Sequence, residues 1–284
     1  MILKLEDITV RDSSARWRDQ WRSADSRWSR KLNPDGMPEP LLQGITGAFT
    51  NGIVQISGPN GSGKTMLLQV MAGLILPDAG RITLDGETAS RSQLRWIIGY
   101  LPQVFGFYPQ WTAREMLRHI ALLKGLVQAK ERERRVAEVL QRTSLTMVAD
   151  RKLATYSRGM RQAVGIAQAL LTEAPVLIFD DPSAGLDPEA RNKLWGLLME
   201  IGQKRLIVWA SSQITDANCA DQVLILARGK NCFWGSPSEL AAIGRELDVS
   251  SLAMLPESTG AGGEYWLKLL KQGYRTVLTR GVSS

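Results

Sequence analysis

The residues of this chain with the clearest chemistry are those at positions 58–65. They read Gly-Pro-Asn-Gly-Ser-Gly-Lys-Thr and match the pattern G-x-x-x-x-G-K-[ST]. In this pattern glycines let backbone N–H groups turn toward a phosphate, the lysine reaches the β- and γ-phosphates, and the last hydroxyl is a ligand for Mg²⁺. We therefore predict a site for ATP and Mg²⁺. The predicted nucleotide contacts are Asn60, Gly61, Ser62, Gly63, Lys64 and Thr65, and Thr65 is also a predicted metal ligand.

Two carboxylates follow an apolar segment farther along the chain. Residues 176–179 (VLIF) precede Asp180 and Asp181. A buried strand delivers such a carboxylate to the Mg²⁺ shell beside the loop hydroxyl, and the next carboxylate can face the water that attacks the γ-phosphate. We therefore assign Asp180 as a metal ligand and Asp181 as the candidate base. The alternative is a pair that caps a helix N-terminus, which the phosphate loop upstream disfavours.

A strand and a helix should hold the phosphate loop. Residues 53–57 (IVQIS) are apolar and β-branched, as in a strand, and residues 66–73 (MLLQVMAG) favour a helix that ends at a glycine. Strand, loop and helix form the context in which the pattern binds phosphate. A glycine-rich turn that arose by chance would have no such flanks.

Apolar segments that predict strands recur along the chain. Residues 2–10 alternate apolar and polar side chains, as in a strand with one buried face. Later segments are continuously apolar, as expected in a parallel sheet buried on both faces, and residues 112–173 are mainly helical. Further strands are predicted near Ile45 and at residues 80–86, 97–101, 176–179, 206–209 and 223–226. The order is a β-rich start, an α/β core, an inserted helical block and a return to the core.

Composition narrows the location and the types of site. The 284 residues are 44% hydrophobic, and no stretch approaches the apolar run of about 18 residues that a membrane span needs. Two cysteines, Cys219 and Cys232, lack metal-type spacing and favour a reducing, cytoplasmic compartment. The only histidine, His119, lies in a helical pattern and is predicted at the surface, which disfavours a catalytic or metal-binding role. The net charge of +7 permits anionic partners but demonstrates none, and we predict no nucleic-acid partner.

Further short motifs occur in a recognisable order. Residues 156–160 (YSRGM) precede a helical segment, Gln103 follows Tyr100, and residues 183–187 (SAGLD) follow the two carboxylates. Together with the phosphate loop, this set resembles the nucleotide-binding subunit of ABC transporters and is exporter-like. The resemblance implies an α/β fold: a P-loop NTPase (RecA-like) core with an antiparallel β subdomain and an inserted α-helical subdomain. Chromosome-maintenance relatives are disfavoured, because a long coiled coil separates their motifs.

The resemblance also implies how such a subunit works. Two subunits form a head-to-tail dimer, and ATP lies between the phosphate loop of one and the signature, residues 156–160, of the other. Ser157 and Gly159 would contact the partner's γ-phosphate, since a helix N-terminus offers free N–H groups to an anion. Gln103 would act as a metal ligand and a catalytic residue that senses Mg²⁺ or water. The aromatic segment 104–111 would meet a transmembrane permease, or else belong to the core of the helical block.

Two departures from the family pattern fall on the chemistry. Asp181 stands where the family usually has Glu, and Gln213 stands where it usually has His. Asp sets its carboxylate back by roughly 1 Å, and a misplacement of that size costs about 10²-fold in rate. Gln213 can hydrogen-bond a phosphate oxygen but cannot carry the charge of a protonated His. We therefore predict intact Mg-ATP binding with slowed hydrolysis, and catalytic roles for Asp181, Gln213 and Gln103.

The signature is less altered. Arg158 replaces one glycine of the common form, whereas Ser157 and Gly159 remain. This favours a heterodimer in which the chain lends its signature to a second, more regular ATPase subunit. The open alternatives are a homodimer in which Asp181 suffices and a regulatory subunit with little or no hydrolysis. A ribosome-associated ABC protein is disfavoured, because those proteins carry two linked cassettes. The predicted location is cytoplasmic and peripheral, on the inner face of the cell membrane, and the predicted direction is export.

A C-terminal extension follows the predicted ATP-binding domain. We predict an ATP-binding domain over residues 1–240, with a helical signature subdomain at 104–172, and a C-terminal extension at 241–284. In that extension, residues 256–263 are predicted to be a flexible linker. Residues 265–271 form a basic amphipathic stretch that docks on the main domain or on a partner.

A tryptophan- and arginine-rich insertion occupies residues 11–40. Trp17, Trp21 and Trp28 would share one face of a helix, with arginines around them. Three interpretations stay open: contact with anionic lipid or the permease, stacking of one tryptophan on adenine, or packing on the protein's own surface.

Overall fold

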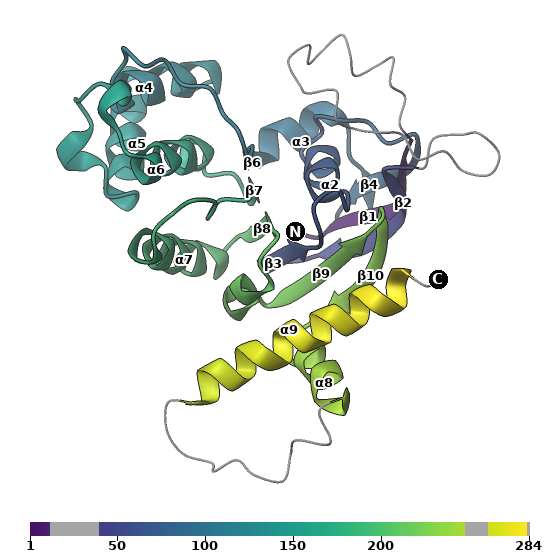
Figure 1. The fold of residues 1–284 in the computed structure, drawn as a ribbon. Coiled ribbons are helices and arrows are strands. Elements are labelled where there is room, and N and C mark those ends of the chain that lie inside the picture. Colours follow the sequence, from purple (N-terminus) through teal and green to yellow (C-terminus); the bar gives the residue numbers. More distant parts are fainter. Residues whose placement is uncertain (12–39, 248–260, 283–284) are drawn as a thin grey trace.

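The computed structural model describes residues 1–11, 40–247 and 261–282 (Figure 1). Two sheets lie at the centre, and a separate helical block flanks the larger one. This is the α/β fold, with an antiparallel sheet and an inserted helical part, that the sequence predicts. Trp17, Trp21 and Trp28 lie outside the described residues, and so do most of the insertion and residues 248–260.

The smaller sheet is antiparallel, with the order β2-β1-β4-β5. In β1 (Leu3–Val10), Leu3 and Leu5 are buried and the alternation then shifts, so that Ile8 and Val10 are buried as well. The shift follows from an irregularity in the pairing with β2 between Leu5 and Ile8. The remaining strands of this sheet are β2 (Leu42–Phe49), β4 (Ala79–Leu84) and β5 (Glu87–Thr88).

The larger sheet has the order β10-β9-β3-β8-β7-β6. Strands β6, β7, β8, β3 and β9 pair in parallel, and β10 pairs antiparallel with β9. All residues of β7 and β8 are buried, as their apolar sequences predict. The strands are β3 (Gly52–Ser57), β6 (Ile98–Leu101), β7 (Val176–Asp180), β8 (Leu206–Ser211), β9 (Gln222–Ala227) and β10 (Lys230–Gly235).

This strand order places three loops at one edge. Because β3, β8 and β7 are parallel neighbours, their carboxyl ends meet at the same edge of the sheet. The segments that follow Ser57, Asp180 and Ser211 therefore start side by side. Ligands bind at this edge in open α/β sheets.

Helices cover the sheets and form the inserted block. Helix α4 begins at a capping box in which Thr112 and Glu115 exchange hydrogen bonds, a device that satisfies free N–H groups at a helix start. His119 is exposed on α4, as predicted, and its ring meets Trp111 edge to face at 5.2 Å. The helices before residue 200 are α2 (Lys64–Met71), α3 (Arg91–Ile97), α4 (Ala113–Leu123), α5 (Ala129–Arg142) and α6 (Arg158–Leu170), with short 3₁₀ turns η1 (Thr146–Val148) and η2 (Leu153–Thr155). The later ones are α7 (Pro188–Gly202), η3 (Ile214–Cys219), α8 (Pro237–Leu247) and α9 (Ala261–Val282).

The aromatic segment 104–111 is divided between core and surface. Phe105, Phe107 and Trp111 pack against the core of the helical block. Val104 and Tyr108, in contrast, are exposed at 86% and 58%. The segment therefore contributes to the local core and also presents apolar side chains outward.

Arg135 joins α5 to the end of α6 within the helical block and gives a prediction on stability. The charged stretch at residues 130–135 predicts a solvated helix face, but the Arg135 side chain is only 4% exposed. It donates to the carbonyls of Leu170 and Leu171 at 3.0 and 3.1 Å, and it pairs with Glu138 and Glu173. The substitution Arg135→Ala should lower the free energy of unfolding by about 3 kcal/mol, because it leaves buried carbonyls without a donor. Urea unfolding measures this.

A matched control for that prediction stands one residue away. Arg134 pairs with Glu131 at the surface. Because exposed ion pairs contribute little to stability, Arg134→Ala should change the unfolding free energy little. Equal losses in the two variants would contradict the structural role given to Arg135.

The C-terminal segment is an integral part of the structure. Helices α8 and α9 cross closely: a Cβ on Gly273 would overlap the Leu240 carbonyl, and one on Gly244 would overlap the Leu269 carbonyl. Helix α9 also packs along β9, β10 and η3 (Figure 1). The basic stretch at 265–271 thus docks on the main sheet.

One expectation for this segment needs correction. Residues 261–263, predicted as the end of a flexible linker, are the first turn of α9. The low helix propensity of glycine is outweighed by burial of the helix farther along, at Leu269, Leu270 and Val277.

Candidate nucleotide site

The loop at residues 58–65 has the backbone of a phosphate cradle. Gly61 and Gly63 have φ angles of 80° and 103°, a region that glycine adopts without strain. A Cβ on Gly58 would overlap the Leu226 carbonyl and come within 2.6 Å of the Ser62 hydroxyl. Gly63 is the N-cap of α2, so the loop ends at a helix N-terminus, where free N–H groups favour an anion.

Lys64 is held within this loop. Its ammonium group donates to the carbonyls of Gly58 and Pro59 at 2.8 and 2.9 Å. Burial lowers the pKa of Lys64, and the negative charges of Asp180 and Asp181 act in the opposite direction. The positive charge therefore lies at the mouth of the loop and close to both carboxylates.

Asp180 fits the role of a Mg²⁺ ligand. It ends β7, is 3% exposed, and its Oδ2 atom has no hydrogen-bond partner among the described residues. Burial raises the pKa of Asp180, and the neighbouring Thr65 hydroxyl partly offsets this. A carboxylate oxygen without a partner beside a hydroxyl is the hard, oxygen-only donor set that Mg²⁺ prefers. Bound Mg²⁺ would supply the positive charge that stabilises the phosphates.

Asp181 follows directly and sits in an unusual backbone conformation. Its φ is 50°, in the left-handed region, and its N–H donates to the Ala210 carbonyl at 3.0 Å. Burial and the Asp216 carboxylate raise the pKa of Asp181, whereas Lys64, Arg191 and Arg158 lower it. Its position is thus fixed by strand β8 on one side and by charged neighbours on the other.

Gln213 begins the loop after β8. Its N–H donates to the Ser211 hydroxyl at 3.0 Å, and its carbonyl accepts from Gln55 of β3 at 2.9 Å. The side chain is exposed. The backbone of Gln213 is therefore anchored while its amide is available to a phosphate. Gln103 is exposed beyond the end of β6, the strand next to β7.

The signature residues belong to the helical block. Ser157 is the N-cap of α6, and its hydroxyl accepts from the Met160 N–H at 3.2 Å. Gly159 has room for a Cβ, since its nearest neighbour, on Leu186, would be 3.6 Å away. The guanidinium of Arg158 lies over Gly185, where any Cβ would overlap it. The signature thus touches the loop at residues 183–187 that follows Asp181.

The structure therefore brings the predicted residues into two groups. The phosphate loop, Asp180, Asp181 and Gln213 gather at one sheet edge, whereas Ser157 and Gly159 start helix α6. Sequence reasoning missed several residues at this edge, namely Tyr100, Ser183, Arg191, Ser211 and Asp216. Their only signal was closeness in sequence to the assigned residues. Burial and the Asp180 charge raise the pKa of Tyr100, which keeps its phenol protonated beside the candidate metal ligand.

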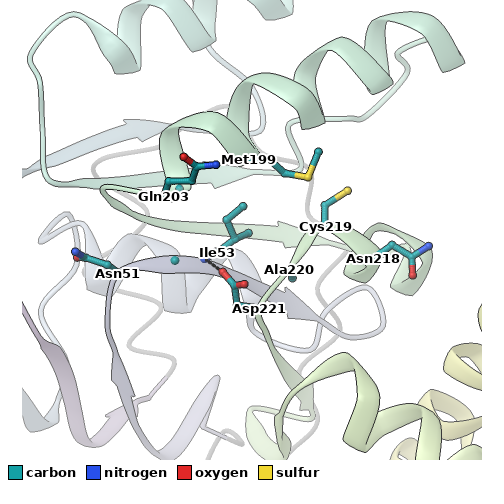
Figure 2. A pocket seen from close by; sticks show the side chains of 10 residues that line it. Asn51, Ile53, Met199, Gln203, Asn218, Cys219, Ala220 and Asp221 are labelled. Carbon is teal, nitrogen blue, oxygen red and sulfur yellow. Dashed lines mark hydrogen bonds between the residues drawn. The ribbon is translucent and has the colours of Figure 1, made fainter.

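A cavity of about 520 Å³ lies at the opposite end of β3. Asn51, Ile53, Met199, Gln203 and Cys219 are among its lining residues (Figure 2). Strand β3 starts here and reaches the phosphate loop only at Ser57, about 16 Å farther on at 3.3 Å per residue. This cavity is therefore separate from the nucleotide site.

Comparisons with known proteins agree with the geometry. A family model described as ABC transporter matches residues 44–184. The chain is 35% identical over 204 residues to "Probable multidrug ABC transporter ATP-binding protein YbhF" of Escherichia coli, covering 71% of this chain and 35% of that protein. It is 32% identical over 225 residues to the Nod factor export ATP-binding protein I of Burkholderia orbicola, covering 78% of this chain and 71% of that protein. The chain thus spans about a third of the length of YbhF.

Solved structures share the fold. CbiO1 from Clostridium perfringens, part of the ABC transporter complex cbiONQ, has a TM-score of 0.68 at 25% identity, covering 87% of this chain and 94% of that one. The ADP- and phosphate-bound dimer of the cassette MJ0796 also has a TM-score of 0.68, at 24% identity, covering 82% of this chain and 98% of that one. Of the helices in the described ranges, none has the length and apolar character needed to cross a bilayer.

Proposed function

Because this chain belongs to the ATP-binding proteins of the ABC transporter family, we propose that it couples binding and hydrolysis of Mg-ATP to a separate membrane permease. The observation that carries this proposal is the gathering of the phosphate loop, Asp180, Asp181 and Gln213 at the carboxyl ends of β3, β7 and β8. Thr65, Gln103 and Asp180 would hold Mg²⁺, and Asp181 would orient the attacking water. The direction is export, as the names of the YbhF and Nod-factor relatives suggest.

The proposed subunit hydrolyses ATP slowly in its own site. Asp181 is held in its left-handed conformation by the contact with Ala210, so its shorter side chain cannot be compensated by a free backbone shift. Gln213 offers an amide but no positive charge. We propose a heterodimer in which Ser157 and Gly159 complete the site of a second, faster ATPase subunit. Asp181 and Gln213 also favour the alternative, a regulatory subunit whose ATP binding matters and whose hydrolysis does not.

Turnover measurements test this proposal. The purified chain should bind ATP but turn over well below the ~1–10³ s⁻¹ usual for enzymes, and co-purification from native membranes should recover a permease and a second ATPase. Mixing the chain with that ATPase should then raise turnover. Fast hydrolysis by the chain alone would remove the slow-site proposal, and unchanged turnover of the mixture would support the regulatory alternative.

We propose that exposed apolar side chains form the surface that meets the permease. Trp96 of α3 is 69% exposed, and its ring lies beside Gly125, at 3.6 Å from where a Cβ would stand. Leu123 and Val127 next to it are also exposed. Val104 and Tyr108 are exposed as well. We propose that these five side chains contribute to the permease contact, since large exposed apolar patches mark protein interaction sites.

The remaining assignments are also proposals. We propose the division into residues 1–240, with a helical part at 104–172, and an extension at 241–284. Lipid or permease contact through Trp17, Trp21 and Trp28 is proposed for residues outside the described ranges. The proposed location is the inner face of the cell membrane.

A further inference from the structure

A buried carboxylate joins two loops of the nucleotide site. Asp216 lies in η3 and is 4% exposed. Its Oδ2 atom accepts hydrogen bonds from the hydroxyls of Ser211 and Ser183, at 2.8 and 3.3 Å. Ser211 ends β8 just before Gln213, whereas Ser183 begins the loop 183–187 after Asp181. One oxygen atom thus links segments that are far apart in the sequence.

The first link controls the backbone of Gln213. The Ser211 hydroxyl that donates to Asp216 also accepts the Gln213 N–H at 3.0 Å. On the other side, the Gln213 carbonyl accepts from Gln55. Both backbone groups of Gln213 are therefore fixed, and one of them depends on the hydroxyl orientation that Asp216 sets.

The second link controls the loop that carries Gly185 and Leu186. Ser183 is 2% exposed and stands two positions before the first of the residues that touch the signature. Gly185 lies under Arg158, and Leu186 lies near Gly159. A bond from Asp216 to Ser183 thus reaches, through one short loop, the surface that completes a partner's site. Arg191 is the cation that faces this cluster, since it lowers the pKa values of Asp216 and Asp181.

We propose that Asp216 is a positioning residue that makes the Gln213 loop and the loop 183–187 move as one unit. Its carboxylate is buried and bonds to Ser183 and Ser211, so it acts through these two residues. This inference rests on the proposed function, because only in the two-subunit arrangement do these loops face different nucleotides: Gln213 the chain's own, and loop 183–187 the one shared with the partner. Asp216 would then relay the occupancy of one site to the other.

Three variants test the coupling. Asp216→Ala removes the shared acceptor, Asp216→Asn keeps an oxygen that can accept from both serines, and Ser183→Ala cuts only the distant link. In hydrogen exchange of the whole chain, Asp216→Ala should speed exchange of the amides at 183–186 and 212–215. Ser183→Ala should speed exchange at 212–215 as well, although it leaves the bond between Ser211 and Asp216 in place. Asp216→Asn should remain close to the wild type.

Turnover gives an independent readout in the complex with the second ATPase. Asp216→Ala should lower kcat by about 10- to 100-fold, the effect of small misplacements at a reacting centre, with ATP affinity unchanged and with recovery in Asp216→Asn. The proposal would be overturned if Ser183→Ala left exchange at 212–215 unchanged. It would also be overturned if the variants exchanged faster by the same factor throughout the molecule. A wild-type chain that neither binds nor hydrolyses ATP would instead refute the proposed function, and the exchange result would still decide the coupling.

Discussion

ATP binding is expected to weaken by about 100-fold when Lys64 is replaced by alanine, because truncating one partner of a buried charge pair costs about 2–5 kcal/mol. Lys64 is the cation at the phosphate loop, where burial has already reduced its hydration and lowered its pKa. The bonds that it makes to Gly58 and Pro59 can be taken over by water, so the fold should survive. Calorimetric titration with ATP and Mg²⁺ measures the change.

A surface lysine gives the matched control. Lys193 pairs with Glu189 at 2.7 Å on the exposed side of α7, so Lys193→Ala should leave ATP affinity unchanged. If Lys64→Ala bound ATP within about threefold of the wild type, the assignment of residues 58–65 as the nucleotide site would be wrong.

The opposite effect is expected at Asp181. Asp181→Glu should raise turnover of the chain by about 10²-fold. The added methylene moves the carboxylate forward by roughly 1 Å, and a misplacement of that size costs about 10²-fold in rate. The backbone is already fixed by its bond to Ala210, so the change acts through the side chain alone. Steady-state phosphate release at saturating ATP measures it.

Two companion variants make this result specific. Asp181→Asn keeps the size of the side chain but removes the base, so it should lower turnover further and leave ATP affinity intact. Gln213→His should add to Asp181→Glu, since the ring can carry a positive charge to the phosphate. Unchanged turnover in Asp181→Glu would mean that the length of this side chain does not limit the rate.

Sequence reasoning succeeded where a signal is local. The phosphate loop and the strand ending at Asp180 are each contained within a few neighbouring residues, and the structure places both at one edge. Asp216 could not be found in this way, because its partner Ser183 lies 33 positions earlier in the sequence. The same holds for Arg135. Its charged neighbours suggest exposure to solvent, whereas its partners Leu170, Leu171 and Glu173 lie 35 to 38 positions later in the sequence.

The C-terminal helix shows a second kind of limit. Residues 261–263 contain two glycines, and composition alone predicts a linker there. At the contact between Gly244 and Gly273, glycine instead stabilises the fold, because it permits close packing of two helices. A propensity scale cannot distinguish these uses, since the second depends on a neighbour that only the folded chain supplies.

The three neighbouring strands that present the nucleotide loops have a consequence for the history of this protein. The strands themselves are buried and supply the stability, whereas Asp181 and Gln213 lie beyond their ends. Substitutions at these two positions can accumulate without destabilising the core, so selection for stability would not remove them. A cassette that hydrolyses ATP quickly and one that hydrolyses it slowly could therefore differ by single codon changes at these two positions. The buried strands would be the same in both.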